Sequence, residues 1–179
     1  MQDLIDILTA MASKKGEIGN PLELFLDMAE RVVKAVGSLF GAKSDEVAIL
    51  IRTSDGGHLR FVAPRKFADL GTIPVTKRDS IAVNVLGRKV GEAMNNVPLV
   101  KHVAFFESVK LREKMVPIQK MITVPILLAG EAVGVAQVSR KGETPAEAGP
   151  DFTQADVKRA QDIFEAVAPY LVKGRPDRY

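Results

Sequence analysis

The chain has 179 residues, of which 46% are hydrophobic, a net charge of +3, and no cysteine. This size suits one domain with a real core, and the lack of cysteine excludes disulfides, thiolate metal sites and cysteine nucleophiles. The small net charge does not indicate nucleic-acid binding, and the sequence shows neither a signal peptide nor an apolar run long enough to span a membrane. We therefore expect a cytoplasmic protein that binds neither nucleic acid nor membrane directly.

Two amphipathic helices are predicted at the start of the chain. Apolar residues at helical spacing predict a short helix over residues 2–13. Asn20 and Pro21 then provide an N-cap and a proline at the first helical position, and Glu23 completes a capping box. A long apolar stripe follows, so we predict a helix over 21–40.

The middle of the chain predicts a mixture of strands and short helices. Residues 47–52 form a short apolar strand pattern that ends at a turn, Asp55 to Gly57, and 59–63 form a second run, which indicates a hairpin. The less regular segment that follows contains three candidate elements: helices at 80–87 and 99–111 and a strand near 90–94.

A second hairpin is predicted within residues 121–142, where two apolar runs meet at Gly130-Glu131. With the loop centred on that dipeptide, Val124 would face Gln137 across the pair. Both faces of the pair are apolar, so we expect this hairpin to lie inside a sheet with helices on both sides. Pro125 lacks an N–H donor, which favours a four-residue loop over a two-residue turn.

The last predicted element is a helix over residues 153–168. Thr153 is its N-cap, with Asp156 at the third position, and apolar residues at helical spacing form its buried face. Pro169 is expected to kink or end this helix, because proline removes a backbone donor and its ring clashes with the preceding turn.

The order and spacing of the C-terminal segments resemble a GAF domain. The resemblance rests on Val124-Pro125-Ile126, Gly130, Val133-Gly134-Val135, a strand to Arg140 and Phe152 to Asp156 at the start of the last helix. It extends less distinctly over most of residues 21–172. It implies an α/β fold of the α+β type, with a central antiparallel sheet of five to six strands. The N- and C-terminal helices would cover one face, and shorter helices and loops would enclose a pocket on the other.

The resemblance also implies a division of the chain into three parts. Residues 1–16 would form an N-terminal helical extension, residues 17–173 the GAF-like domain, and residues 174–179 a flexible tail.

Known GAF chemistries transfer to this chain only where their residues are present. GAF-type free methionine sulfoxide reductases need catalytic cysteines, and covalent bilin attachment generally needs one, whereas this chain has none. The signature of many cyclic-nucleotide-binding GAF domains is matched only in part, by Lys66-Phe67-Ala68-Asp69, which lacks the final Glu. His58 and His102 are far apart in the sequence, which argues against a metal site. We therefore expect no enzymatic activity, and the sequence assigns no catalytic residue and no cofactor.

The middle segment carries the prediction of a binding pocket. From His58 to Leu128 there are twelve Lys and Arg against five Asp and Glu. This excess favours an anionic ligand or an acidic partner, although the same side chains can simply be solvated. The candidate pocket residues, each of which can equally be ordinary core, are Phe61, Arg65, Phe67, Ile81, Val85, Phe105, Phe106, Met121 and Thr123.

Two functions fit these observations. The first is a non-catalytic sensory or regulatory domain that binds a small molecule and signals through helix packing or a partner. The second is a ligand-free scaffold for dimerisation or protein interaction, in which side chains fill the pocket. In either case the amphipathic helices at 2–13, 21–40 and 153–168 can form a homodimer, or they can simply cover their own sheet.

Overall fold

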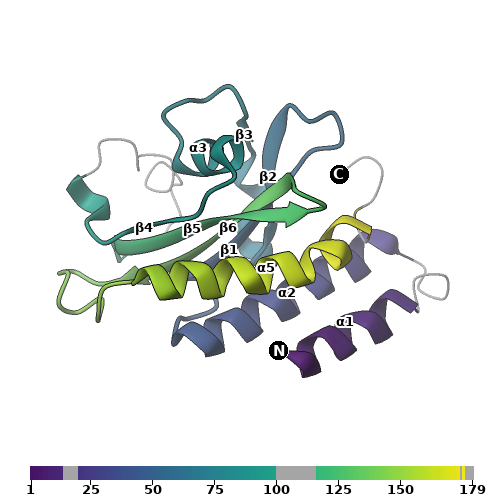
Figure 1. Cartoon of the computed structure of the whole chain (residues 1–179), viewed down its shortest axis with the longest axis horizontal. Helices are drawn as coiled ribbons and strands as arrows, with labels where there is room; N and C mark the ends of the chain where they lie inside the picture. Colours follow the sequence, from purple (N-terminus) through teal and green to yellow (C-terminus); the bar gives the residue numbers. More distant parts are fainter. Residues whose placement is uncertain (14–19, 100–115, 174, 176–179) are drawn as a thin grey trace.

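The structure, a computed structural model, describes residues 1–13, 20–99, 116–173 and 175. Its centre is a six-stranded antiparallel sheet with the order β3-β2-β1-β6-β5-β4 (Figure 1). The strands are β1 (Val47–Arg52), β2 (His58–Ala63), β3 (Thr72–Pro74), β4 (Glu92–Met94), β5 (Ile118–Leu128) and β6 (Glu131–Lys141). The helices are α1 (Gln2–Ser13), α2 (Pro21–Phe40), α3 (Ile81–Arg88) and α5 (Gln154–Lys173), with 3-10 turns η1 (Arg65–Leu70) and η2 (Val97–Leu99).

Most of the predicted elements are present. The two N-terminal helices, the first hairpin and the short helix near residue 80 lie within one or two residues of their expected bounds. The strand expected near 90–94 is β4. The helix expected over 99–111 falls almost wholly outside the described residues, as does much of the expected tail. The boundaries between extension, domain and tail therefore stay predictions.

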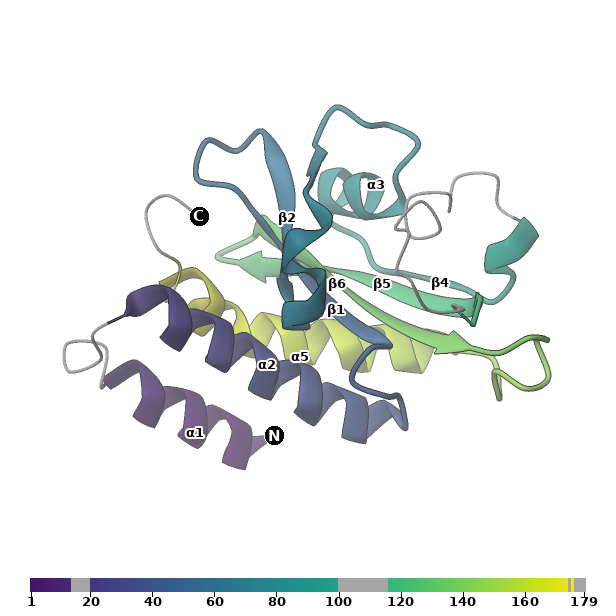
Figure 2. The same cartoon turned by 180° about the vertical axis from the view of Figure 1, so that it is seen from behind.

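Helices α1, α2 and α5 form a layer on one face of the sheet (Figure 2). The predicted N-cap of α2 is confirmed, because the Asn20 side chain accepts hydrogen bonds from the backbone N–H groups of Leu22 and Glu23. Leu4 and Leu8 of α1 are buried in the same core as the apolar faces of α2 and α5. Helix α1 is therefore packed against the rest of the fold. None of the helices in the described part of the chain is long and apolar enough to cross a bilayer.

The capping box of α5 is also confirmed. The N–H and hydroxyl of Thr153 donate to Asp156 Oδ2 at 2.8 and 2.7 Å, and the Asp156 N–H donates back to Thr153 Oγ1 at 3.1 Å. The backbone and side-chain hydrogen bonds from Thr153 hold the pKa of Asp156 below its ordinary value.

Helix α5 does not end at Pro169, although the sequence predicts a kink or an end there. It continues to Lys173, with Leu171 fully buried. Tyr170 shares a hydrogen bond of 2.8 Å with Thr9 of α1. Packing and this side-chain contact therefore hold the last turn in place despite the proline.

The hairpin of β5 and β6 lies inside the sheet, but its turn differs from the prediction. The loop has two residues, Ala129 and Gly130, with φ angles of 51° and 79°. Positive φ at both positions is the geometry of a type I′ turn, whose twist matches paired strands. The four-residue loop favoured from the sequence is therefore wrong, because alanine gives no sequence signal for a left-handed conformation.

The register of the hairpin differs as well. Ile126 pairs with Gly134 but Leu127 pairs with Ala132, which leaves a bulge at Val133. The expected opposition of Val124 and Gln137 is wrong: Val124 lies opposite Ala136, and Thr123 lies opposite Gln137. A shift of one residue on one strand changes which side chains share a face.

Both faces of the sheet are covered, as the apolar hairpin predicts. Val124 and Ala136 belong to the core beneath α2 and α5. Leu50, Phe61 and Val135 belong to a second core with α3 and η1 on the opposite face. Figure 1 shows α3 on the side of the sheet away from α5.

Substitution of Gly134 by alanine will destabilise the protein. A Cβ atom at this position would lie 2.4 Å from the Leu50 carbonyl oxygen and 2.9 Å from Ile51 Cδ1, so β1 and β6 must move apart. We expect a loss of about 1–3 kcal/mol in the free energy of unfolding, measured by urea denaturation. Gly87→Ala is the control, because a Cβ there meets nothing within 4 Å and α3 should gain about 0.5–1 kcal/mol. Equal stability of the two variants would contradict this packing.

Candidate functional site

The sheet face that carries α3 is called the inner face, and side chains alternate along each strand between this face and the helix layer. One half of the inner face is filled by apolar side chains. Phe61 of β2 and Phe67 of η1 are buried and meet edge to face, with ring centroids 5.9 Å apart. Val85 of α3, Leu50 and Val135 are fully buried in the same cluster. We call this region the apolar half, and it is packed as an ordinary core.

The other half of the inner face carries polar side chains and is called the polar half. Its central row crosses four strands through Glu92 (β4), Thr123 (β5), Gln137 (β6) and Ala48 (β1), which are cross-strand partners. Met121 and Ser139 form the neighbouring pair. Thr123 and Gln137 are only 1% and 3% exposed, so this polar pair lies inside the protein.

The hydrogen bonding of Gln137 is incomplete. Its Nε2 donates to Thr123 Oγ1 at 3.3 Å, whereas its Oε1 is buried and has no hydrogen-bond partner in the described part of the chain. A buried acceptor without a donor costs about 1–3 kcal/mol. Such groups are rare in native proteins, and a bound molecule that donated a hydrogen bond to this oxygen would be stabilised here.

The structure brings together only some of the nine residues predicted to form a pocket. Met121 and Thr123 lie in the polar half. Phe61, Phe67, Val85 and the partly buried Ile81 lie in the apolar half. Phe105 and Phe106 lie outside the described residues. Gln137 was missed, because the register expected from the sequence placed it opposite Val124 on the wrong face; its only sequence signal is a lone amide among the apolar and small residues 133–138.

Arg65 contacts α2, on the helix-layer side of the protein. Its guanidinium donates to Glu23 Oε2 at 2.7 Å and to Asp27 Oδ1 at 2.8 Å, and its backbone N–H donates to Glu30. The hydrogen bond with Glu23 is the main cause that raises the pKa of Arg65, and Asp27 adds to it. This arginine is therefore engaged by carboxylates apart from the polar half.

Other basic side chains of the middle segment are paired at the surface as well. Arg88 pairs with Glu92, Lys89 with Glu131 at 3.0 Å, and Lys66 with Asp45 at 3.4 Å.

Asp45 also accepts a hydrogen bond from Lys141. Its burial would raise its pKa, but the hydrogen bond and charge of Lys141, with the charge of Lys66, outweigh burial and keep that pKa below its usual value. Within the described part of the middle segment, Arg65, Lys66, Arg88 and Lys89 are thus each engaged by a carboxylate.

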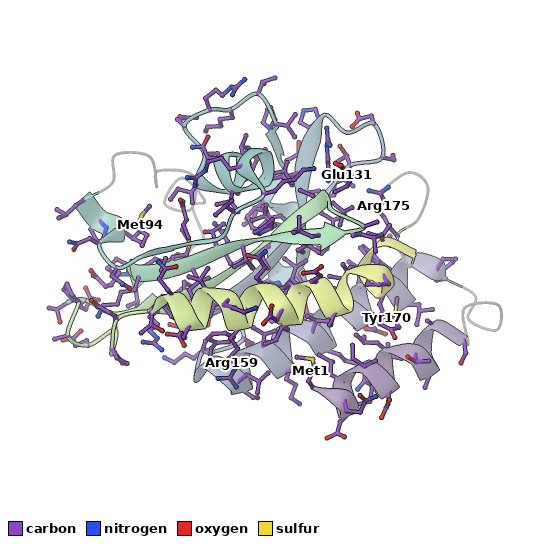
Figure 3. All side chains as sticks on the ribbon, in the orientation of Figure 1. Met1, Met94, Glu131, Arg159, Tyr170 and Arg175 are labelled. Carbon is purple, nitrogen blue, oxygen red and sulfur yellow. The ribbon has the colours of Figure 1, made fainter. Side chains whose placement is uncertain are left out.

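A concavity lies on the helix layer. It is an open hollow of about 550 Å³, lined by Met1, Leu39, Ala155, Lys158, Arg159, Asp162 and Ile163. Figure 3 shows Met1 and Arg159 near each other beneath α5. Leu39 is 37% exposed there, so α1, α2 and α5 present some apolar surface to a partner.

Comparison with solved structures gives a clear result for the fold. The GAF domain of a phosphoenolpyruvate-protein phosphotransferase from Coxiella burnetii superposes with a TM-score of 0.64 at 14% identity, covering 97% of this chain and 95% of that one. The chain has a GAF fold. Residues 122 to 287 of a methyl-accepting chemotaxis protein give a TM-score of 0.61 at 17% identity, covering 92% of this chain and 96% of that one. A type II free methionine-R-sulfoxide reductase from Thermoplasma acidophilum gives 0.59 at 13% identity, covering 86% and 96%.

The sequence matches no protein-family model and no curated protein. At these low identities the GAF-fold neighbours establish the architecture only. The site must therefore be argued from the residues of this chain.

Replacing Arg65 by methionine tests whether this residue belongs to the site. Its partners are on α2 and its side chain is 41% exposed, so solvent screens the ion pairs. We expect a loss of at most about 1 kcal/mol in the free energy of unfolding, which high salt removes, and no change in small-molecule binding. If calorimetry shows that Arg65→Met binds a small molecule much more weakly than the wild-type protein, Arg65 belongs to the binding site after all.

Proposed function

We propose that this GAF-fold chain is a non-catalytic sensory or regulatory domain that binds a small molecule at the polar half of the inner face. The observation that carries this proposal is the buried Thr123–Gln137 pair with its unsatisfied amide oxygen. The structural neighbours support it, since they include GAF domains of phosphotransferases and part of a chemotaxis protein. The reductase neighbour provides a catalytic alternative, but this chain has no cysteine to act as a thiol nucleophile.

The fold offers a path from the polar half to the helix layer. Strand β5 contacts α5 on its opposite face, and β4 is the next strand along the sheet. Just after β4, Asn95 Nδ2 donates to the Phe152 carbonyl and the Phe152 N–H donates to Asn95 Oδ1, both at 2.9 Å. Phe152 immediately precedes the N-cap of α5. A ligand that binds two arrangements of β4 and β5 with different affinity would therefore shift the start of α5.

Native mass spectrometry of the purified full chain tests ligand binding directly. We expect a co-purifying small molecule, or a rise in melting temperature when metabolite mixtures are added. Thr123→Val should lower the affinity about tenfold, because it leaves the bound polar groups without one hydrogen-bond partner. Thr72→Val on edge strand β3 is the control and should bind normally. If neither co-purification nor a melting shift is found, the sensory proposal fails.

A scaffold is the second candidate function, favoured by the filled apolar half and by the hollow on the helix layer. In this proposal two copies of the chain associate through α1, α2 and α5. Sedimentation velocity at micromolar concentration should then show a homodimer.

A matched pair of surface variants tests the dimer interface. Leu39→Glu places a charge in the hollow and should shift the protein to monomer, since an unpaired charge at an apolar contact is costly. Val90→Glu, on the α3–β4 connection, introduces the same charge at another exposed apolar position and should leave the dimer intact. A monomeric wild-type protein would contradict the dimer.

A further inference from the structure

We infer that the ligand of the polar half is an uncharged molecule that donates a hydrogen bond to Gln137 Oε1. This inference rests on the proposed function and adds the chemical class of the ligand. An amide, a urea, the ring N–H of a nucleobase or a neutral hydroxyl has the required donor. The charged group of the anionic ligand expected from the sequence, such as an ionised carboxylate, only accepts hydrogen bonds.

In the structure the Gln137 amide turns its nitrogen toward Thr123. Thr123 lies directly across the β5–β6 pair, and its hydroxyl oxygen accepts from Nε2. On the other side the cross-strand partner is Ala48, whose side chain is a single methyl group. In this orientation the carbonyl oxygen of Gln137 is the unpaired end of the amide, and a ligand that pairs with it must supply a donor.

The charges around this acceptor argue against an anion. Glu92 lies directly opposite Thr123, and its carboxylate is paired with Arg88. Lys120 of β5 pairs with Arg140 and therefore points to the opposite face of the sheet, where its buried ammonium group binds Asp151 at 2.8 Å and the Gly149 carbonyl. An anion here would meet an acceptor oxygen and a carboxylate while these cations are already engaged.

A cationic ligand is disfavoured for a related reason. The carboxylate of Glu92 is already neutralised by Arg88, and Thr123 and Gln137 carry no charge. A buried cation would lose its hydration and would find no free counter-charge among the described residues of this row. An uncharged donor avoids both costs, and it satisfies Gln137 Oε1, the one buried side-chain acceptor without a partner in the described part of the chain.

Gln119 provides a matched comparison within the same strand pair. It is also buried, at 5% exposure, but its Nε2 donates to the Gly142 carbonyl at 2.8 Å. Its amide therefore has a structural role in holding the end of β6. The two glutamines differ in that the hydrogen bonding of Gln137 is incomplete without a guest.

The first test replaces each glutamine by methionine, which has a similar shape and no amide. Gln137→Met removes a buried unsatisfied oxygen, so the ligand-free protein should melt about 2–4 °C higher. Gln119→Met breaks a satisfied buried hydrogen bond and should melt lower by a similar amount. If Gln137→Met melts at the same temperature or lower, or fails to fold, the oxygen is satisfied by the protein or by water and the inference is overturned.

The second test compares two probes of the same size, benzamide and benzoate, at millimolar concentration on the full chain. Benzamide donates hydrogen bonds and is neutral, whereas benzoate is an anion that only accepts. Benzamide should perturb the NMR signals of the Gln137 side-chain amide and of Thr123 in the wild-type protein, and it should leave those of Thr123 unchanged in Gln137→Met. Perturbation of these signals by benzoate in preference, or by neither probe, overturns the assigned class.

The two levels of the proposal can fail separately. A co-purifying ligand that is an anion, or that binds Gln137→Met with unchanged affinity, would contradict the ligand class and leave the sensory function standing. A protein that binds no small molecule in native mass spectrometry or thermal shift would contradict the sensory function itself.

Discussion

The pairing of β5 with β6 is the constraint on which the rest of the structure depends. These two strands lie between β1 and β4, and each contributes side chains to both cores. A two-residue turn and a bulge at Val133 set their register. That register places Val124 and Ala136 under α5 and places Thr123 beside Gln137 on the other face. A slip of one residue on β6 would exchange its two faces, so that Gln137 would face the helix layer and Ala136 the inner face.

The two halves of the inner face have different physical roles. In the apolar half, Phe61, Phe67 and Val85 are packed as core. In the polar half, Thr123 and Gln137 lose their hydrogen bonds to water on folding. Their mutual hydrogen bond replaces only some of these, because Gln137 Oε1 has no partner among the described residues. Such a pair lowers the stability of the fold, and residues of binding sites commonly have this effect.

The contacts between the sheet and α5 explain how binding would reach the helix layer. Asn95 joins the end of β4 to Phe152 through two hydrogen bonds, and Phe152 leads into the capping box at Thr153. The helix that starts there packs against α1 and α2. Any change in β4 or β5 therefore acts on the same helices that carry the exposed hollow.

Much of the architecture follows from local sequence signals. Asn20-Pro21 and Thr153 with Asp156 predict where α2 and α5 begin, because capping depends on side chains within a few residues of the helix end. The continuous apolar pattern of residues 121–138 predicts a hairpin covered on both faces, since neither face has the polar alternation of an exposed sheet. The end of α5 could not be predicted in this way, because Leu171 and Tyr170 are held by contacts with distant parts of the chain.

By itself, the sequence determined the order of the longer helices and strands, although not β3 or the 3-10 turns, together with the burial of the central hairpin and the absence of any cysteine chemistry. Only the tertiary structure decided that Thr123 meets Gln137, that Arg65 binds carboxylates of α2, and that the inner face has a filled half and a polar half. The physical reason is that helix caps and apolar periodicity act over a few residues. Strand register and ion-pair partners depend instead on backbone geometry and on residues far apart in the chain.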